Sequence, residues 1–526
     1  MSVDKWLGDS ITESIHPDFP LNVWKEFASF CAIPHGTFDC QRISKAVAEW
    51  GKRHSFETDV DEAGNVMIRK PASKGKEHIP SLCFQAHIDM VCTKESSLTF
   101  DFKTTGIQTR LVNDPQYGPS VMGTGTTLGA DDGIGAAAAL ALLLENDLEH
   151  GPLECLFTVD EEVGLVGAGK LQPGFVKSKF CVNLDAFDDK TITIGCAGGF
   201  GRTLTRTYQP ASSSNTKIEG DFTKVTVRLF DCRSGHSGFD IGAGRANGIL
   251  ALSTIMFTAT RNFTIYTSRI DGGTKLNVIP QECETDVWVA KKDVEAFETK
   301  VQQAYQVLKA DFSGHDDEMK LEIKKDDSSQ PNGDSVLNPM DSHQIFALLM
   351  TTPHGVLRLS QICPGKVESS VNFYRCTLTA TPFVLSTSFK YRSSSQEQIE
   401  GFRTQLESYA LVNGFVSSEF FSEYPAWIPV PQSKLLSVTK RAYAAARLST
   451  NVTTMSQEQG DQYCNDKIMV HHVGLEPCMM TKLYPGMEFV TLGAHISNCH
   501  SPTESLHIQS VRPFYNTLLN IIRIFE

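Results

Sequence analysis

Histidines and acidic residues gather in five short clusters, most of which follow an apolar run typical of a buried strand. Residues two apart on a strand point to the same face, so His87 and Asp89 should project together. In an open α/β sheet, ligands bind beyond the carboxyl ends of the strands. The clusters therefore predict a metal or catalytic site. They are His87-Ile88-Asp89, Asp131-Asp132, Asp160-Glu161-Glu162, Asn183-Leu184-Asp185 and the segment from His500 to Glu504.

Taken one at a time, the clusters have simpler explanations. A polar strand end can merely be solvated, and acids before a helical run often complement the helix dipole. Together, however, they offer a set of metal ligands. Two zinc ions that share a bridging carboxylate and a water need about five protein ligands. The five candidates are His87, Asp131, Glu162, Asp185 and His500, and Glu161 is then left over as a base.

The elements around these clusters alternate between strand and helix over the first 200 or so residues. Short apolar runs at 81–86, 153–159 and 180–184 predict strands, and periodic apolar positions predict helices at 21–33 and 39–53. The Ala- and Leu-rich run at 133–145 predicts a buried helix. Nearly continuous apolar strands are typical of a sheet covered on both faces. We expect an α/β catalytic domain.

The middle of the chain has a different texture. Its strands, such as 224–229 and 284–289, alternate apolar and polar residues, which is typical of a sheet with one exposed face. A polar break at 324–334 divides this part into two roughly equal halves, which hints at an internal duplication. The last hundred or so residues return to helices and strands. We therefore predict a catalytic domain split into 1–197 and 425–526, with an inserted α+β lid domain at 198–424.

Composition excludes several classes of protein. The chain has 526 residues and a formal net charge of −13, which makes nucleic acid an unlikely partner. Its longest apolar run falls short of the ~20 residues that span a bilayer. The start of the chain lacks the pattern of a secretory signal, and the 14 cysteines include no C-x-x-C pair. We expect a soluble, cytoplasmic enzyme.

Several strings, taken in their order along the chain, resemble the aminoacyl-histidine (Xaa-His) dipeptidases of the di-zinc metallopeptidase superfamily. No single string is specific, but the combination is, and the resemblance covers most of the chain. The strings are His87-Ile88-Asp89-Met90-Val91, Thr127-Leu128-Gly129-Ala130-Asp131, Phe157 to Glu162, Gly195 to Gly199, Gly235-His236-Ser237-Gly238, Gly474-Leu475-Glu476 and His500 to Glu504.

The resemblance implies a role for each residue of the metal site. Asp131 would bridge two divalent ions, zinc by expectation, although cobalt and manganese accept similar ligands. His87 and Asp185 would complete one site, and Glu162 and His500 the other. Asp89 would orient His87, and Glu161 would act as general base toward a metal-bridging water. The fold expected is that of a zinc exopeptidase, with a mixed sheet covered by helices.

The resemblance also implies residues that serve the substrate. His236 in the lid would stabilise the oxyanion, and Asn277 and Arg392 would bind the substrate carboxylate. Glu476 could receive the free amino group of the dipeptide substrate. The expected reaction is hydrolysis of unblocked dipeptides, including β-alanyl-histidine. A related aminoacylase, deacylase or tripeptidase on the same metals stays open, as does a homodimer through the lid in which His236 acts across subunits.

Overall fold

The computed structural model describes residues 20–214, 218–380 and 382–526. The start of the chain, on which the expectation about a secretory signal depends, lies outside them. The chain divides into a catalytic unit of residues 1–196, 427–471 and 475–526, and a lid of residues 197–426 and 472–474. The predicted lid boundaries, 198 and 424, lie one and two residues away. The short return to the lid at His472–Gly474 was not predicted.

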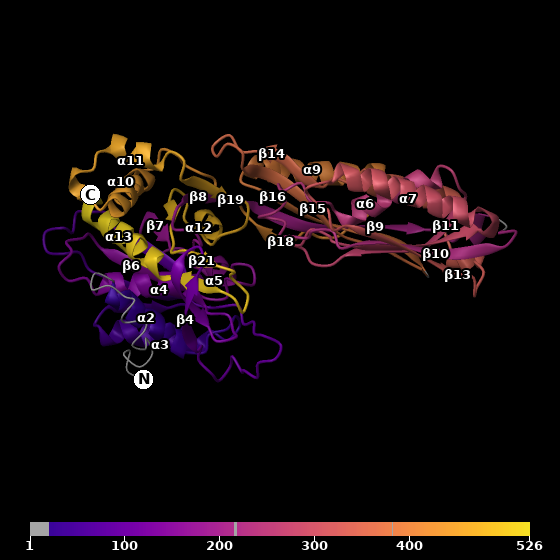
Figure 1. Cartoon of the computed structure of the whole chain (residues 1–526). Coiled ribbons are helices and arrows are strands. Elements are labelled where there is room, and N and C mark those ends of the chain that lie inside the picture. Colours follow the sequence, from indigo (N-terminus) through magenta and orange to yellow (C-terminus); the bar gives the residue numbers. More distant parts are fainter. Residues whose placement is uncertain (1–19, 215–217, 381) are drawn as a thin grey trace. The chain divides into compact units, whose positions relative to one another are not determined.

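A mixed eight-stranded sheet forms the centre of the catalytic unit (Figure 1). Strands β6, β3, β7 and β20 run parallel, and β1, β2 and β8 include antiparallel neighbours. Its order is β1 (Glu57–Val60), β2 (Val66–Lys70), β6 (Leu153–Thr158), β3 (Leu82–His87), β7 (Phe180–Asn183), β20 (Glu488–Thr491), β8 (Ile192–Cys196) and β19 (Ile468–His471). Strands β3 and β6 are buried throughout, and the first and third acid clusters begin where these strands end.

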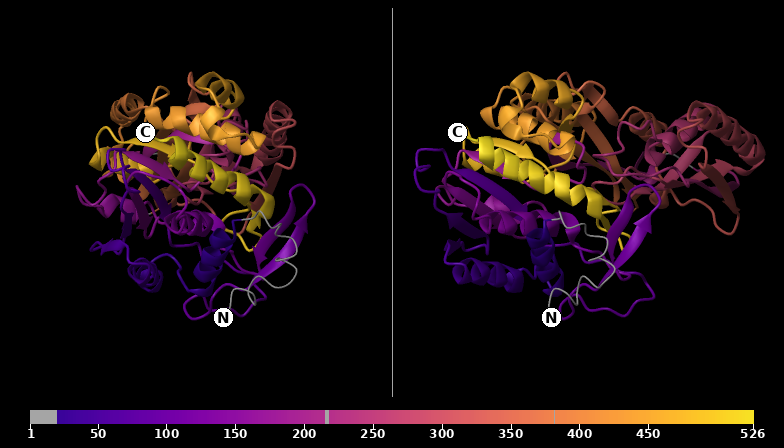
Figure 2. Two further views of the ribbon diagram at one scale, coloured as in Figure 1. Left: turned by 90° about the vertical axis from the view of Figure 1, so that its left-hand side faces the viewer. Right: turned by 60° about the vertical axis from the view of Figure 1, so that its left-hand side comes forward.

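Helices pack on both faces of this sheet. Helix α4 covers one face, where the Cys155 thiol of β6 donates to the carbonyl of Ala139. Helix α12 begins on the opposite face, where Gln85 of β3 contacts Glu476. Helices α10 and α13 lie side by side in both views of Figure 2. The helices are α2 (Leu21–Ala32), α3 (Gln41–Arg53), α4 (Ala130–Leu143), α5 (Val166–Lys170), α10 (Lys434–Leu448), α11 (Gln457–Cys464), α12 (Pro477–Leu483) and α13 (Ile508–Ile524).

A small four-stranded sheet, which was not predicted, completes the catalytic unit. It joins a hairpin early in the chain to the segment around His500. Its order is β21 (Ile496–Ser497), β22 (Ser505–His507), β5 (Gly118–Gly123) and β4 (Thr109–Asp114).

Among the helices of the described ranges, none combines the length and the apolar character that a membrane-spanning helix needs.

The lid is built on one large antiparallel sheet (Figure 1). Its order is β13 (Lys320–Asp326), β10 (Phe222–Phe230), β12 (Cys283–Ala290), β11 (Ile265–Gly273), β15 (Val367–Thr379), β16 (Phe383–Ser393), β9 (Gly198–Tyr208) and β17 (Val416–Ser417), with β14 (Gly355–Leu359) beside β15 and β18 (Phe421–Tyr424) beside β9. Four helices pack on its apolar face: α6 (Gly248–Thr260), α7 (Val294–Asp311), α8 (Pro339–Met350) and α9 (Gln396–Val412).

The predicted fold class is confirmed: a mixed, helix-covered catalytic sheet is interrupted by a separate antiparallel α+β unit. The two roughly equal halves of the lid share a single sheet, in which β11 of the first half pairs with β15 of the second. Apolar and polar residues alternate along β10, so its apolar side chains share one face of the sheet. Val225, Val227 and Leu229 are on this face and pack in the core with the helices.

Candidate metal and catalytic site

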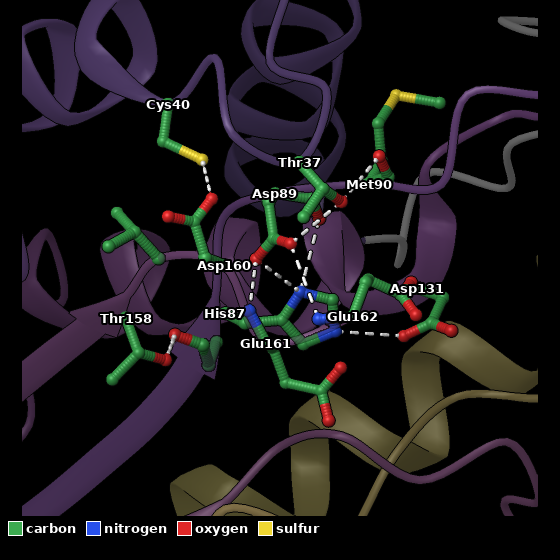
Figure 3. Close-up of polar contacts among 12 residues, drawn as sticks. Thr37, Cys40, His87, Asp89, Met90, Asp131, Thr158, Asp160, Glu161 and Glu162 are labelled. Atoms are coloured by element: carbon green, nitrogen blue, oxygen red, sulfur yellow. Dashed lines mark hydrogen bonds and ion pairs between the residues drawn. The ribbon is translucent and has the colours of Figure 1, made fainter. Parts of the chain in front are cut away.

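Asp89 fixes the orientation of the first candidate ligand, His87 (Figure 3). Nδ1 of His87 lies 3.1 Å from the carbonyl oxygen of Asp89 and 3.5 Å from its carboxylate. The same carboxylate accepts hydrogen bonds from the backbone N–H of Glu161, at 2.9 Å, and from Thr37 Oγ1, at 3.0 Å. Asp89 therefore ties the end of β3 to the turn that carries Glu161 and Glu162, and leaves Nε2 of His87 to face the site.

Asp131 stands between the two candidate histidines. Its Oδ1 is 3.0 Å from Nε2 of His87, and its Oδ2 is 3.1 Å from Nε2 of His500. Glu162 Oε2 lies 3.0 Å from the same nitrogen of His500. Residues that are far apart in sequence thus place two imidazole nitrogens and two carboxylates around one point.

The chemistry of these groups fits divalent cations. Ligand atoms of His87, Asp131 and Glu162 all lie within 4.8 Å of one another. Among the described residues, Oε1 of Glu162 and Oδ1 of Asp185 are buried without a hydrogen-bond partner. Buried carboxylate oxygens of this kind need a cation or a donor, and mixed nitrogen and oxygen ligands suit zinc and its neighbours.

The electrostatics of the cluster also call for positive charge. Burial, reinforced by neighbouring acids, raises the pKa of Glu161 and of Asp185 well above the ordinary range. Burial opposes protonation of His87, but hydrogen bonds with Asp131 and Asp89 outweigh it and raise the pKa of His87. For His500, hydrogen bonds with Asp131 and Glu162 likewise outweigh burial and raise its pKa to about 10. Without cations, protons must compensate these charges.

The predicted lid residues lie near one another within the lid. A backbone bridge joins His236 to Val278, and the carbonyl of Asn277 accepts the N–H of Ser237 at 2.8 Å. Asn372 of β15 donates to the carbonyl of Val278 at 2.9 Å. Arg392 faces Ser370 across the β15–β16 ladder, two residues from Asn372. Its Nη1 donates to the Tyr424 hydroxyl at 2.8 Å, while its buried Nε has no hydrogen-bond partner.

Glu476 lies among the strand ends rather than on a surface. It is 0% exposed, and its Oε2 accepts hydrogen bonds from Gln85 and, at 2.8 Å, from Thr158. Gln85 in turn accepts from Asn183 at 2.7 Å. This placement favours support of the strands β3, β6 and β7 over contact with substrate. Sequence reasoning missed this polar layer, although a glutamine inside the apolar run 82–86 was a signal.

Comparisons with known proteins show the family to which the chain belongs. Residues 83–524 match the model of Peptidase family M20/M25/M40. The chain is 30% identical over 508 residues to the cytosol non-specific dipeptidase of Escherichia coli (strain K12), covering 96% of this chain and 97% of that protein. It also superimposes on the crystal structure of aminoacylhistidine dipeptidase from Vibrio alginolyticus with a TM-score of 0.80 and 27% identity, covering 96% of this chain and 97% of that one.

The matched residues, 83–524, make up most of the chain. The chain belongs to Peptidase family M20/M25/M40 and is a metal-dependent hydrolase of peptide bonds.

Proposed function

We propose that this enzyme is a two-metal dipeptidase whose shared ligand is Asp131. The observation that carries the proposal is the position of the Asp131 carboxylate, whose two oxygens each face a different imidazole at 3.0 and 3.1 Å. A carboxylate held in this way can bridge two cations. His87 and Asp185 would hold one ion, and Glu162 and His500 the other.

The catalytic steps fall to residues of the chain. The bound cations would supply Lewis acidity and lower the pKa of water. Glu161 accepts a proton from the attacking water and later delivers it to the leaving amine. Its backbone is fixed by Asp89, so its carboxylate starts from a defined place. Asp89 also keeps His87 in the orientation that presents Nε2.

We propose unblocked dipeptides, including β-alanyl-histidine, as the substrates. The extended similarity to a non-specific dipeptidase and to an aminoacylhistidine dipeptidase supports this class. The lid residues would serve the substrate, with His236 as the donor to the developing oxyanion. Arg392 and Asn277 would bind the substrate carboxylate, for which a guanidinium offers two parallel donors.

A substrate panel tests this specificity. The purified enzyme is loaded with zinc and assayed on β-alanyl-histidine, other dipeptides, tripeptides and N-acetylated amino acids. We expect kcat/KM for free dipeptides to exceed the values for blocked amines and tripeptides. A clear preference for N-acetylated substrates would instead identify an aminoacylase, and a preference for tripeptides would identify a tripeptidase.

Metal identity, location and assembly complete the proposal. We propose zinc at both positions and a cytosolic enzyme, in line with the name of the Escherichia coli relative. Elemental analysis of protein purified without added metal should give about two zinc ions per chain. Mass measurement in solution distinguishes a monomer from a homodimer. Mixing inactive His236→Ala and Glu161→Ala chains would restore activity only if His236 acts across subunits.

A further inference from the structure

Glu504, four residues after His500, is a buried carboxylate that the catalytic roles above do not use. It lies in the loop between β21 and β22 and is 2% exposed. Its backbone N–H donates to the carbonyl of Ser501 at 3.0 Å, which closes the turn that follows His500. Burial of an acid at this depth requires hydrogen-bond donors that compensate its desolvation.

Four consecutive backbone N–H groups supply those donors. Oε2 of Glu504 accepts from Leu128 at 2.7 Å and from Gly129 at 3.1 Å. Oε1 accepts from Ala130 at 2.8 Å and from Asp131 at 3.4 Å. Such a row of amides around an anion is a strong binding arrangement, because every bond is charge-assisted. Glu504 therefore binds the backbone of the Asp131 segment directly.

The backbone of Asp131 cannot be held by regular helix hydrogen bonds. Gly129 has a positive φ of 72°, and Asp131 (φ −81°, ψ 107°) departs from helical geometry at the beginning of α4. The side chain of Asp131 must nevertheless keep each oxygen about 3 Å from a different histidine. The Glu504 carboxylate supplies the missing restraint, and the same loop carries His500.

We propose that Glu504 is a positioning residue that holds Asp131 and His500 in register as metal ligands. This inference rests on the proposed two-metal site. Through one carboxylate, Glu504 joins the segment of the bridging ligand to the segment of a terminal ligand, which are more than 350 residues apart in the chain. A residue that acted only as a helix cap would contribute to stability without changing affinity for metal.

The substitution Glu504→Gln tests this role. Both oxygens of Glu504 accept two N–H groups each, so either orientation of the glutamine amide points its NH₂ group at two donors. We expect the zinc dissociation constant of the full-length apo protein, measured by competition with a chelator, to rise about tenfold or more. Glu504→Asp keeps the charge on a shorter arm and should recover part of that affinity.

The chain offers a matched control in Glu154→Gln. Glu154 is 3% exposed, and both of its oxygens also accept two donors each, from Arg69, Lys177 and Ser178. It lies near the start of β6, at the opposite end of that strand from Glu162. We expect Glu154→Gln to lower the melting temperature while leaving zinc affinity within about twofold of the parent protein.

The outcomes separate clearly. The inference is overturned if Glu504→Gln binds zinc as tightly as the parent, or if both variants lose zinc in proportion to their loss of melting temperature. If Glu504→Gln does not fold, Glu504→Asp decides in the same way, by its zinc affinity relative to Glu154→Gln. Failure of the parent protein to bind two zinc ions, or to cleave dipeptides, would overturn the proposed function and not the role of Glu504 alone.

Discussion

In the catalytic unit, the central strands β3 and β6 are buried along their whole length, whereas in the lid β10 alternates and the edge strand β13 is largely exposed. A sheet covered on both faces can place polar groups only at strand ends or in fully partnered networks. In this enzyme the proposed metal ligands follow the strand ends, and Gln85 is hydrogen-bonded to Glu476, Thr158 and Asn183.

Charged side chains of the lid sheet lie in partly exposed ion pairs. Arg228 of β10 pairs with Glu282, which precedes β12, and Arg269 of β11 pairs with Glu284 of β12. Solvent screens such pairs, so each contributes little to stability. The comparison teaches that a polar substitution should be costly in the catalytic sheet and mild on the lid surface.

Loss of the proposed base should have the largest effect. We expect Glu161→Gln to lower kcat by about 10²–10⁴-fold, because the amide cannot accept the proton of the attacking water. Zinc content, determined by elemental analysis, should stay at the parent level because Glu161 is not a proposed ligand. The exposed surface acid Glu149 provides the control, and Glu149→Gln should keep full activity. Full activity in Glu161→Gln would contradict the assignment.

Removal of metal should destabilise the catalytic unit alone. Zinc at a hundredfold excess over its dissociation constant stabilises a folded protein by about 3 kcal/mol, and chelation removes this contribution. The buried acids Glu162 and Asp185 then both lie near the charge of Asp131 without cations. Hydrogen exchange after chelation should accelerate in β3, β6 and β7 and stay unchanged in β10 and β12. Equal acceleration in both sets of strands would contradict the contrast between the units.

A pair of truncations compares the two sheets directly. Gln85→Ala removes one of the two buried donors to Glu476 and the buried acceptor of the Asn183 amide, so we expect it to lower the free energy of unfolding by about 1–3 kcal/mol. Glu282→Ala removes a half-exposed partner of Arg228 and should cost about 0–1 kcal/mol. Denaturant titration of both variants, followed by a probe in each unit, measures the difference. Similar costs at the two positions would refute the comparison.

Mild acid should weaken the lid through His354. Its Nδ1 accepts the N–H of Phe373 at 3.3 Å and an amide hydrogen of Asn247 at 3.2 Å, so the folded lid requires the neutral ring. Burial lowers the pKa of His354 to about 4, against about 6.5 when unfolded. The unfolded state therefore binds the proton first. This stabilisation is complete above pH 6.5 and disappears as the pH falls toward 4.

The size of this acid effect follows from linkage. At pH 5.5 the loss should amount to about 1 kcal/mol. Unfolding of the lid, measured at pH 7.5 and 5.5 for the parent and for His354→Gln, checks it. The variant should lose less stability between the two values because glutamine does not titrate. An equal loss in both proteins would assign the acid sensitivity to other groups.

Much of the fold could be predicted because local patterns and burial agree. The predicted helix 21–33 is α2, and the predicted strands 153–159 and 180–184 are β6 and β7, each within about two residues. The small sheet of β4, β5, β21 and β22 escaped prediction. Its strands are short and pair segments almost 400 residues apart, so no local periodicity marks them.

The amino-acid sequence was sufficient to select residues that could do chemistry, because the five clusters together offer a set of metal ligands and a base that no single cluster supplies. It also determined the order of units, since continuous apolar strands and alternating strands differ visibly in the chain. Which of these groups meet became evident only from the folded chain. Asp131 lies between His87 and His500, and Glu476 accepts a hydrogen bond from Thr158. Glu504 accepts backbone hydrogen bonds from the segment of Asp131. All of these are long-range contacts. Such contacts form only when distant segments pack, so no spacing in the sequence records them.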